Sequence, residues 1–184
     1  MFGAISKQIT SLVIAASSLF SSHVTPLFQD CSFHSNNNVL VFSCRIINCY
    51  NKEIEKILQS GQNVELILTY RIFEVGRQLP AHENSKKHTL KYDVIDKFYT
   101  IDREEGEDFF SLDFGLAKEN FASFEDIQVL HIDIFEEGRE YILEITAQFE
   151  PVYLVDMDKN IELMKYWKRP PHHRSNPFDL SDIQ

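Results

Sequence analysis

The 184-residue chain lacks the short motifs that indicate catalysis or tight metal binding. It contains no HExxH or CxxC zinc signature, no GxSxG nucleophile elbow and no EF-hand calcium loop. The adjacent pair His172 and His173 could ligate a metal, but it falls in a polar segment that we do not expect to be rigid. The sequence therefore predicts no enzyme activity, no metal and no cofactor.

Basic residues are scarce as well. The chain has 18 Lys and Arg against 28 Asp and Glu, which gives a formal net charge of −10. Nucleic-acid binding needs a basic face that neutralises phosphates, so nucleic acid is excluded as the main partner. The densest acidic stretch, 104–108, lacks the ligand spacing of a calcium loop and is interpreted as a solvated turn.

Glycine and proline number only six each, whereas phenylalanine and tyrosine number fifteen and seven. This balance favours an aromatic-rich β core. The clearest strand is 63–73, in which apolar residues alternate with Glu65, Thr69 and Arg71. Such alternation is typical of a half-buried β-strand, and we expect the other apolar runs to pack around it.

Those other runs predict six further strands and the connections between them. Asn37 and Asn38 tolerate positive φ and predict a hairpin turn between the first two strands. Short helices are expected over 51–60 and 116–124, and residues 76–88 read as a long polar loop that is either mobile or functional. No βαβ rhythm is visible, so residues 23–151 are predicted to form an antiparallel, immunoglobulin-like β-sandwich of about seven strands. The six further strands are expected at 27–33, 39–46, 90–101, 110–114, 130–134 and 141–149.

Residues 1–22 have the layout of a secretory signal peptide. Lys7 precedes a short apolar run that ends in small residues. The run is shorter than the roughly 20 residues that span a bilayer comfortably. A core helix and an uncleaved anchor are the alternatives. The pattern predicts export, to the periplasm or another part of the cell envelope.

The pattern changes after Pro151. Residues 152–169 are predicted to form an amphipathic helix, and 170–184 a flexible tail. The apolar face of this helix either packs on the core or docks on a protein partner, and its basic end could contact an anionic membrane surface. The residues concerned are Met157, Ile161, Met164, Trp167, Lys168 and Arg169.

Three cysteines are present, at positions 31, 44 and 49. A turn centred on Asn37 and Asn38 places Cys31 opposite Cys44 on the neighbouring strand. In an oxidising compartment we expect these two to form a disulfide while Cys49 stays free. In a reducing compartment all three would act as small apolar side chains.

The order of these segments resembles an uncharacterised family of exported bacterial proteins, domain-of-unknown-function family 4390. The resemblance covers residues 27–149 and rests on three parts of the chain. In 54–71 a short helix and Gly61 lead into the long strand; the other parts are Leu90-Lys91-Tyr92 with Phe98-Tyr99, and 141–145. The resemblance implies an envelope location and a non-catalytic β-rich domain, and it implies no substrate.

Two functions remain open at this point. The first is a non-enzymatic exported β-sandwich that binds an unknown envelope protein or supports an envelope assembly. The second is a binding module for a small molecule, lipid or sugar, with a pocket between the sheets or under the 76–88 loop.

Overall fold

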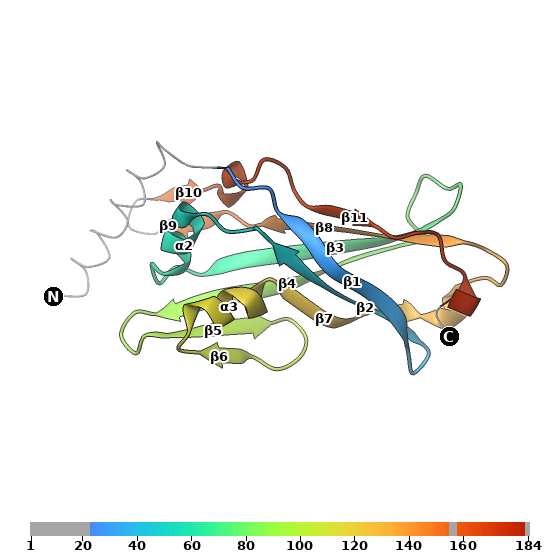
Figure 1. Ribbon diagram of the computed structural model, residues 1–184, viewed down its shortest axis with the longest axis horizontal. Helices are drawn as coiled ribbons and strands as arrows, with labels where there is room; N and C mark the ends of the chain where they lie inside the picture. Colours follow the sequence, from blue (N-terminus) through green and yellow to red (C-terminus); the bar gives the residue numbers. More distant parts are fainter. Residues whose placement is uncertain (1–22, 155–157, 183–184) are drawn as a thin grey trace.

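The computed structural model describes residues 23–154 and 158–182. These residues form a mainly β protein whose strands lie in antiparallel sheets, with two short α-helices (Figure 1). The described residues contain eleven strands, not about seven. Three of the additional strands have only three residues, which is too short to show an alternating pattern in the sequence, and the predicted strand over 90–101 is two strands, His82–Asp93 and Phe98–Arg103. The predicted signal peptide, 1–22, lies outside the described residues.

The larger sheet is built around β3. Its inward residues Val64, Leu66, Leu68 and Tyr70 are fully buried, which confirms the predicted central strand. β3 pairs along its length with β4 on one side and β8 on the other, and three shorter strands extend the sheet. In spatial order the strands are β11 (His172–Arg174), β8 (Tyr141–Phe149), β3 (Val64–Glu74), β4 (His82–Asp93), β5 (Phe98–Arg103) and β6 (Phe109–Ser111).

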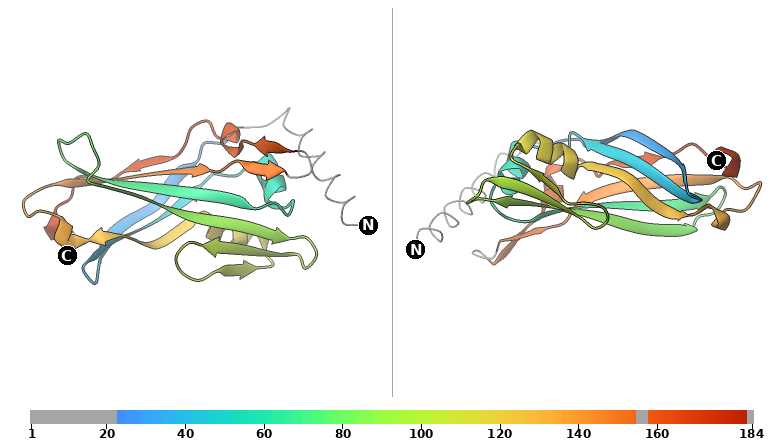
Figure 2. Two further views of the ribbon diagram at one scale, coloured as in Figure 1. Left: turned by 180° about the vertical axis from the view of Figure 1, so that it is seen from behind. Right: turned by 90° about the horizontal axis from the view of Figure 1, so that it is seen from below.

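The smaller sheet consists of β1 (Leu27–Asn36), β2 (Val39–Ile47) and β7 (Ser123–His131). Asn37 and Asn38 both have positive φ at the β1–β2 turn, as the sequence predicts. Figure 2 shows the two sheets as two layers in its right-hand view. Aromatic rings pack between the layers: the ring centroids of Phe42 and Tyr70 lie 5.3 Å apart.

Two helices close one end of the space between the layers. In α2 (Lys52–Leu58), Asn51 caps the first turn by accepting a hydrogen bond from the backbone N–H of Ile54. In α3 (Phe114–Phe121), Asp113 caps the first turn in the same way. Both helices were predicted within a few residues. The described residues contain no helix that is long and apolar enough to cross a membrane.

The predicted helix over 152–169 is wrong. β9 (Val152–Leu154) and β10 (Lys159–Ile161) form a two-stranded antiparallel sheet, and a 3₁₀ turn follows at Leu163–Tyr166. Ile161 and Leu163 are both buried, so the core-facing positions here follow the two-residue period of an extended chain. Trp167 then pairs with Val24 in an isolated bridge.

The segment after residue 169 is not a free tail over its described part. β11 pairs with β8, and Phe178 is buried and bridges to Tyr141. The ring of Phe178 also contacts Phe33 of β1, with centroids 4.8 Å apart. The last described segment therefore joins the edges of both sheets.

Trp167 provides a test of this arrangement. It is 4% exposed, its ring centroid lies 4.8 Å from that of Phe149, and its Nε1–H donates to the carbonyl of Cys49 at 2.8 Å. We expect Trp167→Ala to lower the free energy of unfolding by about 3–5 kcal/mol, because it leaves a large cavity. Urea unfolding measures the change. The exposed neighbour Lys168→Ala is the control, and equal midpoints for the two variants would contradict the packing.

Candidate functional site

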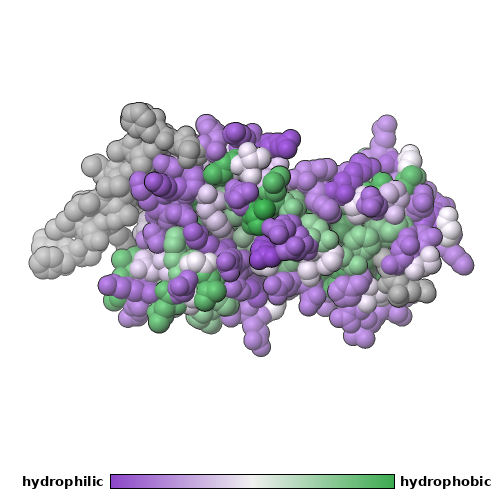
Figure 3. Space-filling view, in the orientation of Figure 1, coloured by the Kyte–Doolittle hydropathy of each residue, from purple (hydrophilic) through white to green (hydrophobic). Residues whose placement is uncertain are grey.

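One end of the molecule exposes an unusual number of large apolar side chains. Five of them lie in the β4–β5 turn, in β6, in the connection from β6 to α3 and in the first turn of α3, and Ile95 and Leu112 are 89% and 80% exposed. Figure 3 shows hydrophobic colour over this end, at the lower left. Apolar surface of this kind marks interaction sites when it gathers in one place. We call Val94, Ile95, Phe110, Leu112 and Leu116 the β6–α3 patch.

β6 is an edge strand of the larger sheet. It pairs with β5 on one side, and it ends the strand order on the other. Phe109 packs against the core, while Phe110 is 64% exposed. The sequence pattern over 110–114 does not reveal this, because alternation defines two faces without saying which one is buried. An edge strand with apolar side chains is a template for pairing with another strand.

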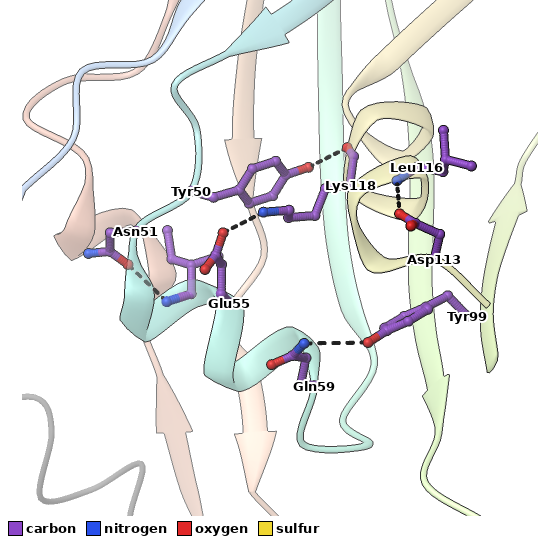
Figure 4. Close-up of polar contacts among 9 residues, drawn as sticks. Tyr50, Asn51, Glu55, Gln59, Tyr99, Asp113, Leu116 and Lys118 are labelled. Carbon is purple, nitrogen blue, oxygen red and sulfur yellow. Dashed lines mark hydrogen bonds and ion pairs between the residues drawn. The ribbon is translucent and has the colours of Figure 1, made fainter. Parts of the chain in front are cut away.

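Contacts with α2 hold α3 in place beside β6 (Figure 4). Lys118 of α3 forms an ion pair with Glu55 of α2, and the hydroxyl of Tyr50 donates to the carbonyl of Lys118 at 2.9 Å. The ammonium of Lys118 also lies 4.7 Å from the ring centroid of Phe114. Burial raises the pKa of Tyr50 well above its ordinary value, so this donor stays protonated. The helix that carries Leu116 is therefore fixed by the core.

Acidic side chains border β6. The β5–β6 loop is exposed at Glu104, Glu105, Glu107 and Asp108. Among the residues that the structure describes, no group of three or more acidic, histidine or cysteine side chains is arranged to hold a metal ion. The carboxylates therefore create a negative electrostatic potential beside the β6–α3 patch.

The predicted 76–88 loop is shorter than expected. β4 begins at His82, so the connection between β3 and β4 covers only 75–81. Polar side chains of β4 lie buried: Lys86 is 8% exposed and its ammonium pairs with Glu105, while His88 is 4% exposed. The length of the predicted central strand could have indicated that β4 begins earlier. A strand of eleven residues has backbone groups along its whole length that a neighbouring strand can pair with.

A second candidate site lies between the β1 edge of the smaller sheet and β11. The opening has a volume of about 530 Å³, which is within the range of small-molecule pockets. Phe33 and Phe178 supply its aromatic surface, and His173, Arg174 and Asp182 supply its titratable groups. Cys31 also lines it.

Cys31 lies in a bulge of β1 that faces Cys44, rather than in the direct ladder pair with Cys44 that the sequence predicts. The register of β1 and β2 places Phe33 opposite Phe42 and Ser32 opposite Ser43, and it then shifts at a bulge. All three cysteines carry free thiols in the structure. A hydrogen bond from the Cys44 thiol lowers the pKa of Cys31, and the same bond, with burial, raises the pKa of Cys44.

The predicted docking residues of the C-terminal segment divide into two groups. Ile161 and Trp167 are buried and Met164 is partly buried, so these side chains pack on the core, which is one of the two alternatives left open by the sequence. Lys168 and Arg169 are exposed. Met157 lies outside the described residues.

Comparison of the chain with family models, with curated proteins and with solved structures finds no match. The candidate sites are therefore assessed on their geometry alone.

His88 gives the stability of the folded chain a predicted pH dependence. Burial lowers its pKa from 6.5 to about 4, although its Nδ1 lies 3.1 Å from the carbonyl of Phe121. Because the folded-state pKa is the lower one, the unfolded chain binds the extra proton as the pH falls from 6.5 to 4. The free energy of unfolding should therefore fall over this window, by roughly 3 kcal/mol from His88.

The variant His88→Gln tests this assignment. It should remove the contribution of this histidine and give a shallower pH profile than the wild type between about pH 4 and 7. Urea unfolding across that range measures both profiles. Parallel profiles for the two proteins would show that His88 is not the group responsible.

Proposed function

We propose that this chain is a non-catalytic binding domain, an immunoglobulin-like β-sandwich in its broad arrangement, that docks a protein partner on the β6–α3 patch. The observation that carries the proposal is the patch itself. Its apolar side chains lie in the β4–β5 turn, on and just after the edge strand β6, and on α3, a helix that ion pairing and hydrogen bonding fix to the core. A preformed surface of this kind lowers the cost of ordering on binding.

The chemistry of the surface defines the partner. The free side of β6 offers backbone groups to an extended segment, which would add to the sheet as a further strand. Phe110 and Leu112 would contact apolar side chains of that segment. The exposed carboxylates of the β5–β6 loop favour basic residues beside them. The partner is accordingly an extended protein segment that carries both apolar and basic residues.

The compartment is part of the same proposal. The layout of 1–22 predicts export, and the resemblance to domain-of-unknown-function family 4390 implies an envelope location. The partner would then be an envelope protein. The exposed basic residues Lys168 and Arg169 lie on a different segment, and a peripheral contact with an anionic membrane through them is compatible with docking at β6.

A double variant, Phe110→Ser with Leu112→Ser, tests the patch. Crosslinking in the native cell followed by affinity purification should recover a partner with the wild type and lose it with the variant. Loss of two large contacts at the centre of an interface costs on the order of 2–4 kcal/mol in binding, or about 30-fold or more in Kd. The binding of the purified partner gives this number.

Leu79→Ser is the matched control. Leu79 is 80% exposed, the same as Leu112, but it lies in the 75–81 loop. Replacing it should leave partner recovery unchanged. Recovery that persists in the double variant, or that falls equally in the control, would refute docking at the β6–α3 patch.

A second candidate function rests on the opening between β1 and β11. Its aromatic side chains and the guanidinium of Arg174 suit a small molecule with an apolar body and an anionic group. Arg174 already donates to Glu144 at 2.7 Å, which fixes the position of the guanidinium. This candidate is independent of the β6–α3 patch.

The anionic aromatic dye 8-anilinonaphthalene-1-sulfonate is a direct probe of this candidate. We expect it to bind the folded protein, and Arg174→Gln to weaken binding by about 5–10-fold, since one charge-assisted hydrogen bond is lost. Arg169→Gln, which removes an exposed arginine outside the pocket, should leave the affinity unchanged. Fluorescence titration measures both, and equal affinities for the two variants would reject the pocket.

A further inference from the structure

Two of the three thiols are placed so that they can react one after the other. Cys31 is partly buried, lies at the bulge of β1 and lines the opening between β1 and β11. Cys44 of β2 is 3% exposed and faces the core beneath it. Ser32 lies opposite Ser43 and Gln29 lies opposite Arg45, so the bulge that contains Cys31 faces Cys44 across the two strands. Cys31 is therefore the more accessible of the two thiols, because Cys44 is almost fully buried even though it lines a smaller opening beside β7.

We propose that Cys31 and Cys44 form a dithiol that reacts with small-molecule disulfides, with Cys31 as the attacking residue and Cys44 as the resolving residue. This inference concerns a covalent site and goes beyond the proposed docking function. It rests on the cross-strand placement of the two residues and on their difference in burial, since Cys31 is partly buried beside the opening and Cys44 is 3% exposed.

The reaction proceeds in two exchange steps. The thiolate of Cys31 attacks one sulfur of a disulfide RSSR, which forms a mixed disulfide and releases one RS⁻. Cys44 then attacks the Cys31 sulfur while its proton passes to the departing RS⁻, and the Cys31–Cys44 bond forms. Both RS⁻ take up the two protons that the protein thiols have lost. The protein is oxidised by two electrons, and RSSR is reduced to two RSH.

The surroundings favour this order of attack. The hydrogen bond from Cys44 stabilises the thiolate of Cys31 and lowers its pKa, which raises the fraction of the reactive form. Arg174 and His173 line the same opening, and Asp30, which opposes the thiolate, is paired with Arg45. The opening holds Asp182 as well as Arg174, which is paired with Glu144, so a small disulfide that carries both carboxylate and ammonium groups, such as glutathione disulfide, matches it.

Cys49 is the internal comparison. It is fully buried, its Sγ lies 3.6 Å from the carbonyl of Ile46, and burial raises its pKa to about 12. Its side chain lines none of the openings described above. The structure therefore separates a reactive pair from an unreactive third thiol.

Incubation of the folded full-length chain with glutathione disulfide tests the proposal. Mass spectrometry of peptides under non-reducing conditions should show a Cys31–Cys44 link and no glutathione on Cys49. Cys44→Ser should stop the reaction at a glutathione adduct on Cys31, whereas Cys31→Ser should slow all modification roughly tenfold or more. Cys49→Ser should behave as the wild type.

The wild type and the variants give results that either support or overturn the proposal. A link between Cys31 and Cys44 in the wild type, with an adduct trapped at position 31 in Cys44→Ser, supports the proposal. Unchanged modification of Cys31→Ser, a link that includes Cys49, or an absence of any reaction in the wild type would overturn it. Circular dichroism of each variant before incubation shows that it is folded, and the wild-type map alone decides if Cys44→Ser does not fold.

Discussion

The arrangement depends on the burial of one face of β3. That face meets the smaller sheet through Phe42 and Tyr70, and the hydroxyl of Tyr70 donates to the carbonyl of Gln128 at 3.1 Å. The tyrosine thus supplies apolar contact and also satisfies a backbone group of β7, the outer strand of the smaller sheet. Since β4 and β8 take their register from β3, the positions of both candidate sites follow from this packing.

The outward face of the larger sheet has the opposite character. Cross-strand ion pairs cover it, among them Arg71 with Glu83 and Lys87 with Glu65. Each pair is half-exposed and contributes little to stability on its own. A broad polar face is costly to desolvate, which is consistent with the proposal that a partner docks at the apolar end near β6 instead.

Sequence patterns predicted the parts of the fold in which local and tertiary preferences agree. The alternation in 63–73, the Asn37–Asn38 turn and the cap at Asn51 all appear in the structure as expected. Sequence patterns failed to predict the structure where contacts with residues far along the chain determine it. Lys86 and His88 read as loop residues because the groups that satisfy them, Glu105 and the carbonyl of Phe121, lie elsewhere in the chain.

The candidate sites were predictable to different degrees. The Cys31–Cys44 neighbourhood follows from the length of one turn, so the sequence contained it. The β6–α3 patch does not follow, since Phe109 and Phe110 are equally apolar and only the packed structure shows which one faces inward. The helical spacing after Pro151 was misleading because it ignored Leu163, which is buried two residues after Ile161.

Contacts between the first and the last described segments have a consequence for the rate of folding. Val24 pairs with Trp167, and Phe33 packs on Phe178, so each contact spans most of the described chain. During synthesis β1 can pair with β2 early, but the free edge of β1 stays uncovered until the residues near 167 and 178 have been made. Contacts of such long sequence separation slow folding. Until they form, β1 remains an uncovered edge and the chain needs protection from pairing with other strands.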